Sequence, residues 1–333
     1  MQNLKLIYAL EDGTGIHALN GVSVKLHQGE RLGVVGESGS GKSTVAKTIL
    51  RLLPPNARLT EGEVFFKRRN LLALPESQMN ELRWKEISLV TQSAMNALNP
   101  VARISDQMVE TFLAHRRMDR ATILEESGRL FEKVGLSRNR IFDFPHQFSG
   151  GMRQRVVIAL AIALSPALII ADEPTTALDV IMQAQIIQLL KSLSDEKGIS
   201  ILLITHDISI VAEICHTVAV MYAGTLMEYG RIDKVFSTPC HPYTMGLKGA
   251  FPTIKDLAKR LVSIPGSPPR LTDSLTTCGF LERCPFAVGR CRDEVPSLQR
   301  IEEDHSVACF RAHEAEKFRE TIVDRFRMET LRR

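Results

Sequence analysis

The sequence lacks any run of about 20 apolar residues, the length that a membrane-spanning helix requires. Its longest apolar stretch covers residues 156–171, is broken by Ser165-Pro166 and is followed directly by acidic residues. This stretch is predicted to form a buried helix followed by a buried strand. The first five residues also lack the charged-then-apolar pattern of a secretory signal. We therefore expect a cytosolic protein that associates with a membrane only through partners.

A large excess of charge of one sign is also missing. The 333 residues carry a formal net charge of +4, with 44% hydrophobic and 24% charged residues. So small an excess gives no reason to expect binding to nucleic acid. The composition is typical of a soluble globular protein, and the length allows a full core and two domains.

Cysteine pairs of the form C-x₂-C are absent, which disfavours a common zinc ribbon. Four of the six cysteines nevertheless cluster near the C-terminus, at Cys278, Cys284, Cys291 and Cys309. In a reducing compartment such a cluster indicates metal ligands rather than disulfides. Four thiolates suit either tetrahedral Zn²⁺ or a [4Fe–4S] cluster, and unligated thiols are the third alternative. Cys215 and Cys240 lie outside this spacing and are expected to be ordinary buried residues.

Apolar segments that alternate with helical spacing predict a doubly wound α/β fold, in which ligands bind beyond the carboxyl ends of parallel strands. Strands are expected at residues 4–8, 22–26, 31–35, 62–66, 86–90, 167–171 and 199–204, with a hairpin at 218–222 and 225–229. Helical spacing covers about 105–164 and 180–193. Beyond about residue 235, prolines punctuate short segments, which predicts a second, loop-rich module that ends in an amphipathic helix over 313–333. We therefore expect two domains, at 1–235 and 236–333.

A glycine-rich segment with the pattern G-x-x-x-x-G-K-S follows the strand at 31–35 and leads into a helix. Such a junction lets consecutive backbone N–H groups surround a phosphate at a helix N-terminus. The lysine is expected to reach the outer phosphates, and the serine after it to ligate Mg²⁺. A glycine-rich turn without a ligand is the alternative. The predicted phosphate-binding residues are Gly36, Glu37, Ser38, Gly39, Ser40, Gly41, Lys42, Ser43 and Thr44.

Polar residues follow three other predicted strands. Asp172-Glu173 ends the strand at 167–171, His206 follows the strand at 199–204, and Gln92 follows the strand at 86–90. Hydrolysis of a magnesium-nucleotide needs an acid that holds the metal and a group that orients the attacking water. Asp172 suits the first role and Glu173 the second, whereas His206 is a donor to the γ-phosphate and Gln92 a ligand of Mg²⁺ or water. The alternatives are a helix cap for the acidic pair and a satisfied loop residue for the histidine.

A second pair of glycines predicts another phosphate-binding helix end. Ser149 is a good N-cap, and Gly150 and Gly151 leave backbone N–H groups bare at the start of the helix that follows. Two such ends in one chain need not face the same nucleotide. A natural use of the second is in trans, on the nucleotide of another subunit.

Together these segments resemble the nucleotide-binding subunits of ABC transporters. The matching motifs, in family order, are Walker A (36–43), the Q-loop (Gln92), the signature (148–152), Walker B (168–173), the D-loop (177–179, with Asp179) and the switch histidine (His206). The signature Phe-Ser-Gly-Gly-Met departs from the common Leu-Ser-Gly-Gly-Gln at its first and last positions. The resemblance implies ATP and Mg²⁺ and a RecA-like core with an antiparallel β subdomain and a helical subdomain at about 95–165. It also implies a head-to-tail dimer, and an adenine-stacking aromatic for which Tyr8 is the candidate and a core tyrosine the alternative.

The resemblance narrows to the ATPases of oligopeptide and dipeptide importers, and covers nearly the whole chain. It rests on Ala97-Leu98-Asn99-Pro100, His241-Pro242-Tyr243-Thr244, residues 264–269 and the cysteine-bearing tail. Within that group the chain is similar to dipeptide-permease D-type subunits, whose dimer partner is usually a similar F-type subunit. The resemblance implies a [4Fe–4S] cluster on the four cysteines, two transmembrane permease subunits, an external substrate-binding protein that acts indirectly, no nucleic acid, and a peripheral position on the cytoplasmic face of the membrane.

Two other functional classes remain as alternatives. A soluble ABC ATPase usually has tandem cassettes or long coiled-coil insertions, whereas this chain has a single cassette. A degenerate nucleotide-binding regulator is disfavoured because Lys42, Asp172, Glu173 and His206 are intact. In such importers the membrane subunits and the binding protein select the cargo, so the sequence does not separate peptides from nickel or sugars.

Overall fold

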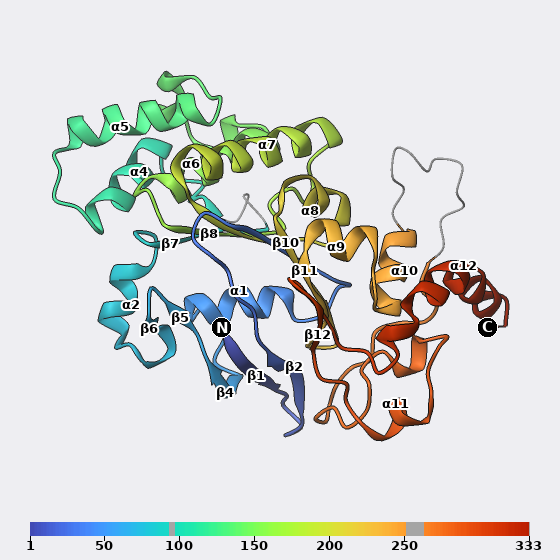
Figure 1. Ribbon diagram of the computed structural model, residues 1–333. Helices are drawn as coiled ribbons and strands as arrows, with labels where there is room; N and C mark the ends of the chain where they lie inside the picture. Colours follow the sequence, from blue (N-terminus) through green and yellow to red (C-terminus); the bar gives the residue numbers. More distant parts are fainter. Residues whose placement is uncertain (93–96, 251–262, 333) are drawn as a thin grey trace. The chain divides into compact units, whose positions relative to one another are not determined.

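The computed structural model describes residues 1–92, 97–250 and 263–332, which form two compact units (Figure 1). The first unit consists of Met1–Lys25, Leu32–Ala73 and Thr205–Arg333, and the second of Leu26–Arg31 and Leu74–Ile204. The domain boundary predicted near residue 235 falls within the first unit and stays a prediction. None of the helices within the described ranges is long and apolar enough to cross a membrane.

An antiparallel sheet of the first unit has the strand order β2-β1-β4. Its strands are β1 (Gln2–Ala9), β2 (Gly15–Val22) and β4 (Ala57–Glu63). The strand predicted at 22–26 is wrong, because β2 ends where that segment begins. Val22, the last residue of β2, and Val24 are buried, at 1% and 5% exposure, so the alternation reports burial that continues beyond the end of the strand.

A second group of strands in the first unit has the order β12-β13-β11-β10-β3. Strand β3 (Arg31–Val35) runs parallel to β10, and the predicted hairpin of β10 and β11 is confirmed. The other strands are β5 (Phe65–Phe66), β6 (Arg69–Asn70), β10 (Thr217–Tyr222), β11 (Thr225–Arg231), β12 (Gln299–Glu302) and β13 (His305–Val307). The α-helices of this unit are α1 (Lys42–Leu50), α8 (Ile208–Ile214), α9 (Ile232–Ser237), α10 (Pro242–Ala250), α11 (Gly289–Asp293) and α12 (Ala315–Arg332).

Three parallel strands of the second unit have the order β9-β8-β7, as expected of a doubly wound fold. They are β7 (Ile87–Val90), β8 (Leu168–Asp172) and β9 (Ser200–Ile204). The α-helices of this unit are α2 (Glu76–Leu82), α4 (Ile104–Leu113), α5 (Arg120–Lys133), α6 (Gly150–Ile162) and α7 (Val180–Lys197). Most of the predicted helical region about 95–165 is therefore helical, although residues 95 and 96 lie outside the described residues.

The amphipathic helix predicted at 313–333 is confirmed as α12, which packs beside α10 within the first unit (Figure 1). Its apolar residues at four-residue steps, Phe318, Ile322 and Phe326, are all buried. The apolar face of α12 is thus covered by its own unit, as the sequence predicted.

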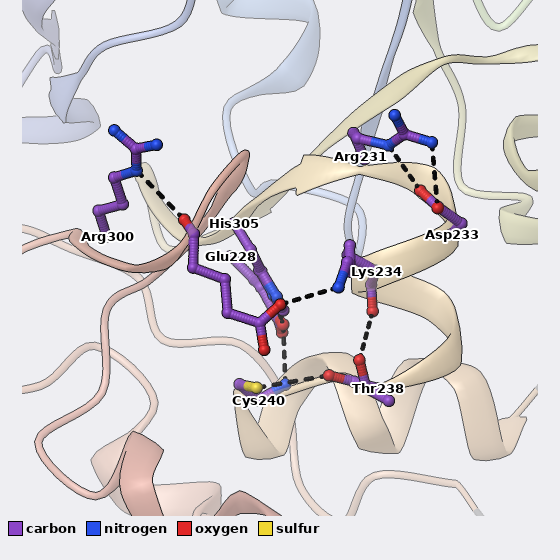
Figure 2. A network of polar contacts seen from close by, with 9 residues as sticks. Glu228, Arg231, Asp233, Lys234, Thr238, Cys240, Arg300 and His305 are labelled. Atoms are coloured by element: carbon purple, nitrogen blue, oxygen red, sulfur yellow. Dashed lines mark hydrogen bonds and ion pairs between the residues drawn. The ribbon is translucent and has the colours of Figure 1, made fainter.

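A buried carboxylate joins the C-terminal strands to the hairpin (Figure 2). Glu228 of β11 is fully buried, and its Oε1 pairs with Nε2 of His305 at 2.7 Å and accepts from the backbone N–H of Cys240 at 2.8 Å. Its Oε2 accepts from the backbone N–H of His241 at 3.0 Å. Glu228, Cys240 and His305 are close enough to share a metal ion. The carboxylate is already satisfied by three donors, however, so hydrogen bonding is sufficient reason for the cluster.

The two cysteines outside the C-terminal spacing differ in burial. Cys215 is buried, as predicted, whereas Cys240 is only half-buried. The thiol of Cys240 donates to the carbonyl oxygen of Thr238 at 3.4 Å, and burial raises its pKa to about 11.

Candidate functional site

The phosphate loop of the first unit follows a fully buried strand, β3, and its shape depends on glycine. A Cβ at Gly36 would lie 2.1 Å from the carbonyl oxygen of Met221, and one at Gly41 would lie 2.5 Å from that of Ala18. Gly41 also has a φ of +100°, which side chains rarely adopt. Both glycines of the G-x-x-x-x-G-K-S pattern are therefore required by close backbone approach.

The helix that leaves this loop presents an anion-binding end. Gly41 is the N-cap of α1 and offers no side-chain hydrogen bond to the helix, and the first turn contains no acidic residue. The first backbone N–H groups of a helix and its dipole favour a negative group there. The local structure is thus the one that the sequence predicted for a phosphate.

The ammonium group of Lys42 is held over the loop. The side chain is 6% exposed, and its Nζ donates to the carbonyl oxygens of Gly36 and Glu37, both at 2.8 Å, and to Oγ of Ser40 at 3.4 Å. These contacts hold the buried ammonium group beside the loop, where its charge suits an anionic ligand. This position agrees with the predicted contact to the outer phosphates.

Two other predicted residues of the first unit lie close to elements of the loop. The hydroxyl of Tyr8 and Oγ1 of Thr44 in α1 are 3.2 Å apart. His206 is exposed and follows Thr205, whose backbone N–H donates to the carbonyl oxygen of Val34 in β3 at 3.2 Å. The structure therefore brings Tyr8 to the loop helix, and the chain before His206 to the loop strand.

In the second unit, the carboxyl end of β8 carries a predicted catalytic pair. Oε2 of Glu173 accepts from Nε2 of Gln92 at 3.2 Å and from Oγ1 of Thr176 at 2.9 Å. Glu173 has a φ of +47°, in the left-handed region that a residue with a side chain occupies at a cost of roughly 1–3 kcal/mol. Such strain clusters at functional sites, where it aims a side chain. Gln92 and Glu173, predicted separately, are thus in contact, and Asp172, the last residue of β8, immediately precedes Glu173.

The signature and the D-loop are neighbours in the same unit. Ser149 is the N-cap of α6 and its Oγ accepts from the backbone N–H of Met152 at 3.4 Å, whereas Asp179 caps α7 through the backbone N–H of Met182 at 2.9 Å. A Cβ at Gly151 would lie 2.1 Å from the terminal methyl of Met182, so the two helix ends are in close contact and a larger residue would require that methionine to move.

The first residue of the signature serves a packing role. Phe148 is 3% exposed, meets the ring of Phe131 edge-on at a centroid distance of 6.4 Å, and lies under the guanidinium of Arg140. Phenylalanine in place of the common leucine therefore changes the buried anchor and leaves the exposed serine unaffected.

The four clustered cysteines line one cavity of the first unit. Cys278, Cys284, Cys291 and Cys309 surround a free space of about 20 Å³, together with apolar side chains that include Phe280 and Phe286. Burial raises the pKa of the Cys278 and Cys309 thiols, each to about 11, and raises that of Cys284 as well. Thiolates in so apolar a cavity require a cation as their partner.

Sequence reasoning missed residues that hold the predicted ones in place. Thr176 donates to Glu173, the hydroxyl of Tyr243 accepts from the backbone N–H of Glu37, and Arg283 forms an ion pair with the Glu37 carboxylate. Tyr243 belonged to a family motif, and Arg283 precedes a candidate metal ligand, but neither fact indicates a contact with the loop.

The first unit contains a G-x-x-x-x-G-K-S loop after a buried strand, and the second contains an Asp-Glu pair at the end of a parallel strand. Both are motifs of ATP-binding cassettes. Comparison with known proteins agrees with this class. The family description "ABC transporter" matches residues 19–176, and "Oligopeptide/dipeptide transporter, C-terminal region" matches residues 227–291.

Similar proteins cover most of the chain. The oligopeptide transport ATP-binding protein OppD of Salmonella typhimurium is 44% identical over 93% of this chain and 92% of its own length. The dipeptide transport ATP-binding protein DppD of Lactococcus lactis is 44% identical over 87% of this chain and 84% of its own. The "Probable peptide ABC transporter ATP-binding protein y4tR" of Sinorhizobium fredii is 46% identical over 89% and 90%. The chain belongs to the ATP-binding subunits of ABC transporters and is an ATPase of that type.

Solved structures support the same fold. The ATP-binding cassette MJ0796, in a dimeric post-hydrolysis state bound to ADP and phosphate, matches with a TM-score of 0.62 and 29% identity over 69% of this chain and 97% of that one. The cassette part of the predicted fold is thereby confirmed. The predicted cofactors ATP and Mg²⁺ are those expected of an ABC ATPase.

Proposed function

We propose that this chain is the energy-coupling ATPase of an importer for dipeptides or oligopeptides, bound to the cytoplasmic face of the membrane through two permease subunits. The observation that carries this proposal is the match of residues 227–291 to the C-terminal region of oligopeptide/dipeptide transporters, outside the cassette that all ABC proteins share. The relatives named for peptide transport also align over both segments. The soluble, non-transport ATPase is not favoured by these relatives.

In the proposed reaction, the loop residues 36–44 bind the phosphates of ATP, and Lys42 neutralises the outer ones. Glu173 orients and deprotonates the attacking water, and His206 donates to the γ-phosphate. Ser43, Gln92 and Asp172 offer the oxygen donors that Mg²⁺ prefers. The contact of Gln92 with Glu173 supports this division of labour, since it joins a metal ligand to the group that holds the water.

The signature is proposed to act on the ATP of a second ATPase subunit, either a copy of this chain or a similar one. Ser149, Gly150 and the D-loop Asp179 are exposed at adjoining helix ends. Beside them Val180 and Ile181 are 80% and 72% exposed, an apolar pair that association would cover. A dimeric solved cassette of the same fold supports this arrangement.

A groove of the second unit offers a place for the permease. It encloses about 680 Å³, and its lining includes the apolar side chains of Trp84, Leu89 and Leu160 together with Thr111. Thr91, which also lines the groove, immediately precedes Gln92. A partner segment in this groove would touch the strand end that carries a metal ligand, and so couple transport to hydrolysis.

We expect Thr111→Trp, which fills the groove, to lower co-purification of the chain with its permease subunits severalfold. Ala121→Trp places the same bulk on exposed α5 of the same unit and serves as the control. Peptide-stimulated ATP hydrolysis, measured in vesicles with a peptide-loaded binding protein, should fall in parallel for Thr111→Trp only. A wild-type chain that binds no permease, and instead co-purifies with ribosomes or nucleic acid, would refute the importer.

The C-terminal module over residues 236–333 is proposed to hold a [4Fe–4S] cluster on Cys278, Cys284, Cys291 and Cys309. Zinc with Zn–S bonds of about 2.3 Å brings its sulfur ligands to about 3.8 Å from one another. All four cysteines line one cavity, as either a zinc ion or a cluster with four thiolate ligands requires, and the resemblance to peptide-importer ATPases favours the cluster. The free space is small, so the cavity has to widen around a cluster. Its role there is structural, since no residue assigned to hydrolysis lines the cavity.

Anaerobically purified protein is expected to be brown, with about four iron and four sulfide per chain for a cluster of this type. Cys309→Ser should remove most of the iron, whereas Cys215→Ser, outside the cavity, should leave the iron content unchanged. Colourless protein with one zinc and no iron would instead support the zinc alternative.

A further inference from the structure

Arg283 connects the cysteine cavity to the phosphate loop. It ends a short 3-10 helix, Leu281–Arg283, which lies between the cavity cysteines Cys278 and Cys284. Nη1 of Arg283 donates to Oε2 of Glu37 at 2.7 Å, and Nη2 donates to Oε1 at 3.1 Å. The two groups thus form a bidentate pair, with the Arg283 side chain 5% exposed and that of Glu37 24% exposed.

Every N–H group of the guanidinium is used. Besides the pair with Glu37, Nε donates to the carbonyl oxygen of Pro265 at 2.8 Å, Nη1 to the hydroxyl of Tyr222 at 3.1 Å, and Nη2 to the carbonyl oxygen of Ile264 at 3.1 Å. A guanidinium has five such donors in a fixed fork, so one orientation satisfies all of them. The position of Glu37 is therefore set by the segment that holds Arg283.

A second connection runs in parallel through aromatic rings. His241 and Phe280 line the cysteine cavity, and the ring of Phe280 lies 5.4 Å from that of Tyr243. The hydroxyl of Tyr243 accepts from the backbone N–H of Glu37 at 2.9 Å. Tyr243 and Phe280 are essentially fully buried, so a shift of the cavity wall is passed on by packing.

Glu37, the residue that Arg283 and Tyr243 contact, belongs to the phosphate loop itself. The carbonyl oxygen of Glu37 accepts from Nζ of Lys42 at 2.8 Å, so the side chain, the N–H and the carbonyl of Glu37 all have fixed partners. Movement of Glu37 would displace one of the acceptors that position the ammonium group for a phosphate.

We infer that Arg283 is a positioning residue for the phosphate loop, through which the packing of the four-cysteine cavity sets the affinity for nucleotide. The inference rests on the proposed function only where it names the cluster in the cysteine cavity. The ion pair between Arg283 and Glu37 does not depend on which group the cysteines bind.

A double-mutant cycle with Arg283→Gln and Glu37→Gln tests the link, with the affinity for a fluorescent ADP analogue as the readout. Arg283→Gln is expected to weaken binding roughly 5- to 150-fold, the usual range of coupling between sites. The double variant should bind no more weakly than Arg283→Gln alone, because both changes remove one interaction. Arg283→Lys keeps the charge but loses the fork, so it should restore only part of the affinity.

Arg231→Gln is the matched control, because Arg231 forms a bidentate pair with Asp233 on the surface of the same unit, outside the cavity and the loop. Thermal unfolding, followed for all variants, identifies losses that arise from unfolding. Unchanged affinity in folded Arg283→Gln, or losses that add in the double variant, would overturn the inference.

The cavity arm of the test uses Cys309→Ser, which changes the wall without touching Glu37 or Arg283. A folded variant with lower nucleotide affinity and unchanged affinity for permease subunits supports the link, and a folded variant with wild-type nucleotide affinity contradicts it. Iron and zinc content, measured in the same samples, tests the proposed cluster separately. A wild-type protein without metal refutes the cluster. The double-mutant cycle of Arg283 and Glu37 then decides alone whether the cavity module positions the phosphate loop.

Discussion

Replacement of Glu173 by glutamine is expected to lower the rate of ATP hydrolysis by about 10²- to 10⁴-fold, the usual contribution of a general base. Glutamine has nearly the same shape, so the contacts with Gln92 and Thr176 keep acceptable geometry. It cannot take a proton from water. Nucleotide binding should therefore survive, and the ATP-bound dimer should accumulate.

Phosphate release under single-turnover conditions and equilibrium binding of ATP measure the two effects separately. Glu196→Gln, on the exposed last turn of α7, is the matched control and should hydrolyse ATP at the normal rate. Normal turnover in Glu173→Gln would show that another group activates the water, and would withdraw the role assigned to this carboxylate.

Loss of the Lys42 charge is expected to weaken ATP binding roughly 10- to 150-fold, since a hydrogen bond to a charged group contributes about 1.5–3 kcal/mol. In Lys42→Gln the loop keeps acceptors but has no cation to offset the phosphate charge. Because the ammonium group is buried over the loop, solvent cannot replace it.

Titration with a fluorescent ATP analogue measures the affinity, and Lys47→Gln is the control. Lys47 lies on the same helix but is exposed, and its loss should change binding little. An affinity in Lys42→Gln within about twofold of wild type, well short of the expected change, would mean that the backbone N–H groups alone bind the phosphates.

The parts of the site that the sequence predicted are those that local rules determine. Gly36 and Gly41 were predictable because the glycine pattern marks backbone positions that admit no Cβ. Strand β8 is confirmed, because a short apolar run that ends at an acidic pair is typical of a buried strand. The strand at 22–26 was wrong because alternating burial also occurs beyond strand ends: Val24 follows β2 and exchanges backbone hydrogen bonds with Met1, yet belongs to no strand.

Long-range contacts could not be predicted. Arg283 and Glu37 are 246 positions apart, and Tyr243 and Glu37 are 206 apart. Nothing in the residues around either end indicates the other, since the contact depends on how the C-terminal segment packs. Glu173 was predicted by its place after a strand, but its left-handed backbone was not, because glutamate has no preference for that region.

The buried Glu228 network has a consequence for synthesis of the chain. The ribosome synthesises the phosphate loop first and Glu228 after it. His305, which pairs with the Glu228 carboxylate, follows Glu228 by 77 positions. Until His305 emerges, the carboxylate of Glu228, which is fully buried in the finished protein, has only the backbone N–H groups of Cys240 and His241 as donors. The unit that carries the phosphate loop is therefore completed only after β13 has been made, and a nascent chain that stalls before β13 should be a poor binder of ATP.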